Sequence, residues 1–278
     1  MKSFDPVTPA RLRAPDLRAR AGRHALALLP VLLALLWQGD FGLPLRLAAA
    51  ALAALLLDAL LLGLRGQSIR AGARAAGGLL PAALSVLCLG PGASLPACII
   101  AACIVVVVGR HLYGGPGRAP FNPVMLGWAV ILLTMPSASA WPQGDDWLPV
   151  SLACAVGGLI LIGWRLIAWQ TPLLLLAGAA ILAGVLLVGG DAVALAQAAR
   201  APEVALFALA ICFVASDPAS SCVSRRGRWL FAVGLVALAL SACLLGARAD
   251  QSLAFSTLLL NALAPWLDSA APQRDQPP

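Results

Sequence analysis

The stretch that decides the fold is residues 44–64, which read PLRLAAAALAALLLDALLLGL. As a helix rising ~1.5 Å per residue, such a run crosses the roughly 30 Å hydrocarbon core of a bilayer. Similar apolar blocks recur along all 278 residues, of which 61% are hydrophobic and 11% charged, at a mean hydropathy of +0.90. Soluble domains carry about 25% charged residues, so the composition excludes a cytosolic enzyme. Continuous Leu- and Ala-rich runs also exclude a transmembrane β-barrel, whose strands alternate.

The apolar blocks predict an all-α polytopic membrane fold of about ten spans. Two of the spans are short, the third and the eighth, since ~11–12 residues cover only about 17 Å of hydrocarbon. These are corresponding positions in two five-helix halves, and an odd number of spans per half makes the halves an inverted-topology repeat. We therefore expect a central pocket or path. The expected spans are 24–38, 44–64, 77–90, 95–109, 122–136, 148–168, 171–189, 203–215, 229–246 and 252–267.

The spans divide the chain into five regions. We expect a basic arm at 1–23, a first half at 24–136, a short outer loop at 137–147, a second half at 148–267 and a tail at 268–278. In the arm, Pro6, Pro9 and Pro15 argue against a helix, because proline lacks the backbone N–H that a helix needs.

The net charge of +7 is mostly a topology signal. When the joints are assigned alternately to two sides, 16 of the 19 basic residues fall on the side of the N-terminus. Only Arg46, Arg200 and Arg248 fall on the other side. Basic residues stay in the cytoplasm, so both termini are predicted to be cytoplasmic. The same sorting argues against a nucleic-acid surface, which needs a basic stripe on a folded domain.

The joint at residues 109–125, GRHLYGGPGRAPFNPVM, is the strongest local feature. Backbone amides at Gly114 and Gly115 could bind an anion or ring carbonyls. Asn122 has two compatible interpretations: its amide points into a central cavity, or it caps the fifth span with Pro123 in the first helical position. The counterpart in the second half is Asp217, which ends a short span before a proline and either caps local backbone or faces an arginine of its loop.

Asp58 lies inside the second span. A carboxylate there costs about 2.5–3.5 kcal/mol on insertion scales, so it should face the bundle. Two interpretations stay open: Asp58 handles a proton or cation on an ion path, or it makes an interhelical hydrogen bond.

Other reactive side chains point to no catalytic centre. The seven cysteines lie mostly in apolar runs without a CxxC pair, which is typical of packing residues. The two histidines, His24 and His111, lie at predicted cytoplasmic helix ends, and their spacing does not favour haem ligation. The chain contains no P-loop, zinc motif, dinucleotide fingerprint or triad spacing. We expect no metal site and no catalysis by this chain alone.

Three motifs carry a resemblance to a known family. The run 111–123, HLYGGPGRAPFNP, followed by Gly127, resembles the signature of the D subunit of the Rnf electron-transport complex, which is related to the B subunit of the sodium-translocating NADH:quinone reductase. The segment 216–218, SDP, with 227–228, GR, and the segment 58–68, DALLLGLRGQS, also match this RnfD/NqrB family. The likeness covers nearly all of residues 24–267.

The resemblance implies a ten-helix subunit of two inverted halves, similar to the urea-channel fold, in a bacterial inner membrane. It implies assembly with other Rnf membrane subunits, passage of electrons through flavin, and coupling of electron transfer to ion translocation. The alternative is a stand-alone urea-channel-like channel or carrier without a redox role, and a purely structural assembly partner is a third hypothesis.

The family carries an FMN joined to a threonine of a Ser-x-Ala-Thr motif in the outer loop. Here that loop, 137–147, reads SASAWPQGDDW and contains no threonine. The chain is also short for the family at this loop. We therefore predict that covalent FMN is absent, and that a non-covalent flavin would be lined by Gly114, Gly115, Asn122 and Asp217. The four threonines of the chain, none of which follows Ser-x-Ala, are Thr8, Thr134, Thr171 and Thr257.

Overall fold

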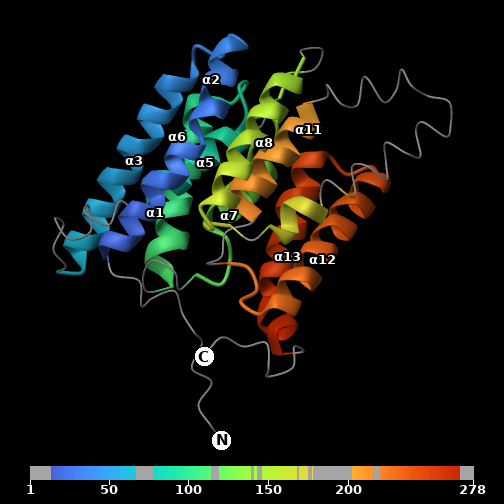
Figure 1. The fold of residues 1–278 in the computed structure, drawn as a ribbon. Coiled ribbons are helices and arrows are strands. Elements are labelled where there is room, and N and C mark those ends of the chain that lie inside the picture. The colour runs from blue at the N-terminus through green and yellow to red at the C-terminus, as the bar shows by residue number, and fades with distance from the viewer. Residues whose placement is uncertain are drawn as a thin grey trace, which may run out of the picture.

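The regular elements of the computed structural model are helical throughout the part of the chain that it describes, residues 14–66, 78–113, 119–138, 141–142, 146–167, 169–174, 177, 202–215 and 220–269 (Figure 1). In chain order they are α1 (Ala14–Ala27), α2 (Leu29–Trp37), α3 (Leu43–Leu64), α5 (Leu79–Leu89), α6 (Leu95–Val106), the π-helix η2 (Val107–Leu112), α7 (Pro123–Thr134), the 3-10 turn η3 (Pro136–Ala138), α8 (Leu148–Gly163), α11 (Pro202–Ala210), the π-helix η4 (Ile211–Ala215), α12 (Arg225–Leu244) and α13 (Ala249–Ser269).

These helices follow the expected spans closely, with one exception in the described residues. The seventh span, 171–189, lies mostly outside the described residues. Among the described residues, Ala19–Trp37 and Leu43–Leu64 pass a test of length and composition for crossing a membrane, and five further apolar helices are shorter, at 10–17 residues. The exception is α1, which begins at Ala14 although proline was expected to prevent a helix there. Pro15 stands in the first helical turn, where its missing N–H costs nothing.

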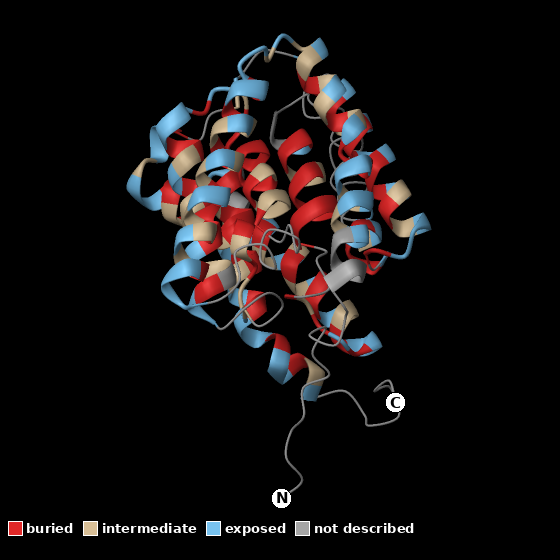
Figure 2. Ribbon diagram, turned by 90° about the vertical axis from the view of Figure 1, so that its left-hand side faces the viewer, coloured by how far each residue is buried: buried red, intermediate tan, exposed pale blue. Residues whose placement is uncertain are grey.

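The two short helices form the centre of the bundle. Seven of the eleven residues of α5 are buried, and α5 packs against α3, α6 and α7. All five residues of η4, the continuation of α11, are buried as well. Figure 2 shows that buried residues, in red, are concentrated inside the bundle, and that exposed residues, in pale blue, lie on the outer faces of the surrounding helices.

Close helix packing in this centre depends on small residues. A Cβ on Gly157 of α8 would overlap the ring of Phe213 in η4 and would come 2.5 Å from the carbonyl oxygen of Ala27. The next residue, Gly158, lies against Cys212 in the same way. Glycine at these positions lets helix backbones approach each other, as is common between membrane helices.

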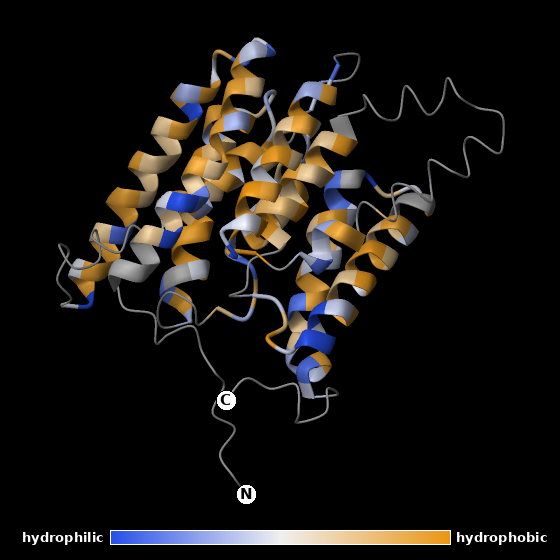
Figure 3. Cartoon of the chain, viewed as in Figure 1, coloured by the Kyte–Doolittle hydropathy of each residue, from blue (hydrophilic) through white to orange (hydrophobic). Residues whose placement is uncertain are grey.

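The outer faces of the helices are apolar. On α3, Leu45, Leu52, Leu56 and Leu60 are each between 58% and 64% exposed. Figure 3 shows hydrophobic residues along the lengths of the helices and hydrophilic ones gathered mainly towards helix ends. A water-soluble monomer rarely exposes an apolar surface of this extent, so this surface is suited to contact with lipid.

Polar contacts between joints occur at both ends of the bundle. At one end, Gln38 Nε2 donates to the backbone oxygen of Asp146, at 2.7 Å. At the other end, the backbone N–H groups of Val223 and Ser224 donate to the carboxylate of Asp268, both at 2.9 Å. In each contact, the two partners lie in or beside connecting segments that the alternating assignment places on the same side of the membrane.

Candidate functional site

Asp58 is buried inside the bundle and hydrogen-bonded to another helix. Its Oδ1 lies 2.8 Å from Nε2 of His111, and the two residues are only 6% and 5% exposed. Asp58 belongs to α3 and His111 to the π-helix η2. The interhelical hydrogen bond expected of a buried carboxylate is therefore confirmed, and its partner is a side chain that can also carry a proton.

The residue that follows α3 also holds the backbone of His111. The guanidinium Nη2 of Arg65 donates to the carbonyl oxygen of His111, at 2.7 Å. Arg65 follows α3 about two turns beyond Asp58, so α3 holds this residue by its ring and by its backbone. π-Turns occur frequently at functional sites, and here the π-turn presents the His111 ring to Asp58.

The π-helix η2 also abuts the beginning of α7. A Cβ on Gly109 would overlap the ring of Pro123. Glycine is therefore required at this position for η2 to pack directly on the first residue of α7. This contact places the Asp58–His111 pair next to the element that Asn122 caps.

Asn122 is a double cap: its side chain satisfies backbone groups at the ends of two helices. Its Oδ1 accepts from the N–H groups of Val124 and Met125, at 3.0 and 3.3 Å, which caps the N-terminus of α7. Its Nδ2 donates to the carbonyl of Val214, at 2.8 Å, near the C-terminal end of η4. The capping role expected for Asn122 is confirmed, and the second helix was not expected.

Two further side chains complete the buried polar cluster around Asn122. Nδ2 of Asn122 also donates to Oγ of Ser220, at 3.2 Å, and the N–H of Asn122 donates to Oδ1 of Asn261 in α13, at 2.9 Å. Nδ2 of Asn261 donates to the carbonyl of Ser220, at 2.7 Å. Sequence reasoning missed Asn261, although an amide inside an apolar span calls for a buried partner by the same physical argument as Asp58.

Of the four predicted flavin-lining residues, Asn122 lies within the described part of the chain, whereas Gly114, Gly115 and Asp217 lie outside it. The side-chain amide of Asn122 is fully engaged with protein groups, so its observed role is to connect α7, η4 and Ser220.

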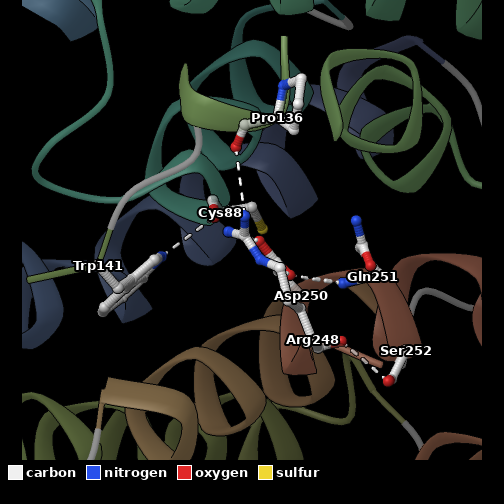
Figure 4. A network of polar contacts seen from close by, with 7 residues as sticks. All are labelled: Cys88, Pro136, Trp141, Arg248, Asp250, Gln251 and Ser252. Atoms are coloured by element: carbon white, nitrogen blue, oxygen red, sulfur yellow. Dashed lines mark hydrogen bonds and ion pairs between the residues drawn. The ribbon is translucent and has the colours of Figure 1, made fainter. Parts of the chain in front are cut away.

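At the opposite end of the bundle the short outer loop folds onto the core (Figure 4). Nε1 of Trp141 donates to the carbonyl of Cys88 at the end of α5, at 3.3 Å, and the ring of Trp141 packs edge-to-face on that of Trp147, with centroids 5.1 Å apart. Arg248 pairs with Asp250, at 2.7 Å, and donates to the carbonyl of Pro136, at 3.4 Å. The indole of Trp141 therefore ties the described part of this loop to the C-terminal end of α5.

Three of the four threonines lie within the described residues, Thr134, Thr171 and Thr257, and Thr171 and Thr257 are buried. Oγ1 of Thr134 donates to Val130 O and Oγ1 of Thr257 to Leu253 O, each at 2.8 Å. Thr257 is in addition fully buried. Among the described residues there is also no group of three or more His, Cys, Asp or Glu side chains that could hold a metal ion.

In the part of the chain that the structure describes, the regular elements are helices with apolar outer faces, which is the arrangement of a helical membrane protein. The sequence model of the NQR2, RnfD, RnfE family matches residues 9–149 and 143–276, and the chain belongs to this family. The resemblance inferred from the three motifs is therefore confirmed.

Relatives cover most of the chain. A protein of Pseudomonas aeruginosa (strain LESB58), named as the D subunit of an ion-translocating oxidoreductase complex, is 29% identical over 304 residues that cover 87% of this chain and 86% of the relative. Proteins of the same name from Alcanivorax borkumensis and Tolumonas auensis are 29% and 26% identical, covering 87% and 90% of this chain and 87% and 92% of theirs. The family and these names indicate a subunit of an ion-translocating oxidoreductase complex.

Proposed function

We propose that the chain is the D-type membrane subunit of an Rnf-type complex and that Asp58 lies on the path of the translocated ion. The observation that carries the proposal is a carboxylate that is 6% exposed in α3, a helix whose other face is apolar and exposed. A buried intramembrane carboxylate is costly and is typically retained for function. The partners would be the other membrane subunits of the complex.

The proposed topology has ten spans in two inverted, urea-channel-like halves, with both termini in the cytoplasm of a bacterial cell. The burial of α5 and of α11 with η4 supports two interrupted central helices. The polar contacts at each end of the bundle support the alternation of joints. The excess of arginine in the joints on the N-terminal side supports the orientation.

We further propose that this subunit carries no covalent FMN. The two family matches overlap at 143–149, across the end of the outer loop and the first two residues of α8. The alignment with the Pseudomonas relative, at 304 residues, is longer than this chain of 278, so that relative has insertions. A flavin bound without a covalent bond would supply electron transfer, and Gly114, Gly115, Asn122 and Asp217 would be its nearest residues.

The experiment is to purify the tagged chain from its native membranes and to assay ion transport in inverted vesicles. We expect the other Rnf subunits to co-purify, and D58N to abolish transport driven by electron donors. The matched control is D146N, an exposed carboxylate at the opposite end of the bundle. Full transport by D58N would overturn the ion path.

The alternative, a stand-alone channel or carrier, predicts different outcomes. The chain would purify without other subunits, and vesicles containing it alone would show passive flux without an electron donor.

The proposed absence of covalently bound FMN is tested separately. Denatured, acid-washed protein should retain no flavin fluorescence, and retained fluorescence on the intact chain would contradict the proposal.

A further inference from the structure

The residues that follow α8 present an arginine and two tryptophans to the outside of the bundle. Trp164 and Trp169 are each nearly half exposed, and Arg165 is exposed as well. Leu166 and Ile167, by contrast, are buried in the core. The two aliphatic side chains anchor this part of the chain, so the arginine and the tryptophans are held at the surface.

Arg165 adopts a backbone conformation that arginine rarely takes. Its φ is +56°, in the left-handed region. The N–H of Leu166 donates to the carbonyl of Leu161, and the N–H of Arg165 to that of Ile162, both at 2.9 Å. These two bonds close the end of α8 as a Schellman turn, in which glycine is the usual residue at the left-handed position. A side chain is strained there, and such an outlier points to a function for the guanidinium.

A contact between two tryptophans joins this part of the chain to the start of α12. The rings of Trp169 and Trp229 pack edge-to-face, with centroids 5.4 Å apart. Arg225 and Arg226, both exposed, lie four and three residues before Trp229 in α12. Side chains at these spacings share one face of a helix. Together, Arg165, Arg225 and Arg226 form one positively charged surface, the arginine surface.

The carboxylate of Asp268, which also faces the start of α12, is engaged by other groups. It accepts from the backbone N–H groups of Val223 and Ser224, both at 2.9 Å, and from Oγ of Ser224, at 2.7 Å. Arg228 in turn donates to the carbonyl of Val223, at 2.7 Å. Because Asp268 and Arg228 carry opposite charges, the described part of the arginine surface stays positive.

An apolar stripe continues from the arginine surface along α12. Leu230 and Val233 are about half exposed, and Leu240 is more than one-third exposed. With the exposed Ala237, the spacings are three, four and three residues, which places the four side chains on one face of the helix. Figure 3 shows hydrophilic residues at the lower ends of α12 and α13 and hydrophobic residues along their lengths. A charged end followed by an apolar stripe matches an amphiphile, whereas a soluble anion would contact only the charged end.

We propose that the arginine surface and the Trp169–Trp229 pair bind the headgroup of an anionic phospholipid, whose acyl chains lie along the apolar stripe of α12. Guanidinium groups bind phosphate oxygens through paired hydrogen bonds, and basic pockets between membrane helices hold anionic headgroups. Indole rings favour the headgroup level of a bilayer. The inference requires only that the chain lies in a membrane, and it is independent of the proposed ion path.

Native mass spectrometry of the full-length chain in detergent tests the inference. Two lipids with the same acyl chains are compared, dioleoylphosphatidylglycerol and dioleoylphosphatidylcholine, and we expect the anionic one to bind more tightly. R165G and R225Q should each weaken its binding about fivefold, the effect of one arginine near a charged headgroup. The matched control is R20Q, because Arg20 is an exposed arginine of α1 outside the proposed site. It should bind the lipid as wild type does.

The glycine variant separates the charge from folding. R165G should unfold at the same temperature as wild type or a higher one, because glycine adopts the left-handed conformation without strain. R165K, which keeps the charge, should retain most of the binding. Equal binding of the two lipids by wild type would overturn the inference, and this comparison needs no variant. Unchanged lipid binding by R165G and R225Q would overturn it as well.

A brominated form of the phosphatidylglycerol locates the bound lipid, because bromine quenches nearby tryptophan fluorescence. At one lipid per chain, W169F should lose part of the quenching that wild type shows. W37F should lose none, since Trp37 ends α2 at the opposite end of the bundle. Quenching that W169F leaves unchanged would contradict the placement. Release of the lipid by inorganic phosphate, but not by sodium chloride of equal ionic strength, would assign the site to a soluble anion instead.

Discussion

The backbone N–H of Asn122 donates to Oδ1 of Asn261, at 2.9 Å, across 139 positions of the sequence. The bond joins the N-cap residue of α7 to the middle of α13, and both side chains are almost fully buried, at 1% and 2% exposure. Asn122 also caps the C-terminal end of η4. The N-terminus of α7, the end of η4 and the middle of α13 therefore meet at this residue. The following predictions begin with this cluster.

Replacing Asn122 with alanine should destabilise the chain by about 2–4 kcal/mol. About 1 kcal/mol comes from the lost cap of α7, and the remainder from leaving Val214 O and Ser220 Oγ without their buried donor. Thermal unfolding in detergent, followed by circular dichroism, measures the effect. N261A should cost less, and the double variant should cost less than the two single changes added together, because the residues share one network. Strict additivity would contradict that coupling.

Two of the three glycines of α8, Gly157 and Gly163, should respond in opposite ways to alanine. G157A places a methyl group against Ala27 O and the Phe213 ring, so α8 must move away from the core and unfolding should occur at lower temperature. Gly163, at the end of the same helix, has nothing within 4 Å of its Cβ position. G163A should be neutral or stabilise by up to about 1 kcal/mol, since alanine favours a helix over glycine. Equal effects of the two changes would argue against the tight α8–η4 contact.

Cys222, in the joint before α12, should resist alkylation in the folded protein. Burial raises the pKa of its thiol from 9.0 to about 12, so very little reactive thiolate is present at pH 8. Maleimide labelling followed by peptide mass spectrometry should show Cys222 modified only after unfolding in detergent and urea. The neutral thiol contributes stability fully below pH 9, and that contribution should be lost as the pH rises from 9 towards 12. Fast labelling at pH 8 would contradict the buried placement.

The proposed orientation predicts the location of a reporter fused after Ser269. A fluorescent protein that folds only in the cytoplasm should fluoresce there, and alkaline phosphatase at the same position should be inactive. Fusions after Asp146, in the outer loop, should give the reverse pattern. The same pattern at both positions would require an even number of spans between them, whereas the proposed topology has five.

The fold could be predicted well from sequence because its main signal is local. Apolar runs bounded by glycine, proline and arginine define α3, α5 and α8 to within a few residues, since a bilayer leaves a backbone little choice but a helix. The start of α1 was predicted too late because Pro15 was taken as a helix breaker, although it occupies the one turn that tolerates proline.

The candidate site could be predicted only in part. Asp58 and Asn122 were identified because a carboxylate in an apolar run and an asparagine before proline each have a local physical meaning. His111 as the partner of Asp58, and Asn261 as the partner of Asn122, depend on contacts 53 and 139 positions apart. No periodicity or motif carries that information in a single sequence, and only the packing of the helices brings these residues together.

The π-turn of η2 makes the Asp58–His111 pair depend on the number of residues in one helical turn. A π-turn holds one residue more than an α-turn, and each residue of a helix turns the chain by about 100°. The wider turn already absorbs that extra residue, so one more residue inserted between Val107 and Arg110 would rotate the His111 ring by about 100°, away from Asp58. Chain length at this point, as well as side-chain identity, is therefore under constraint, and insertions in η2 should be less tolerated than substitutions.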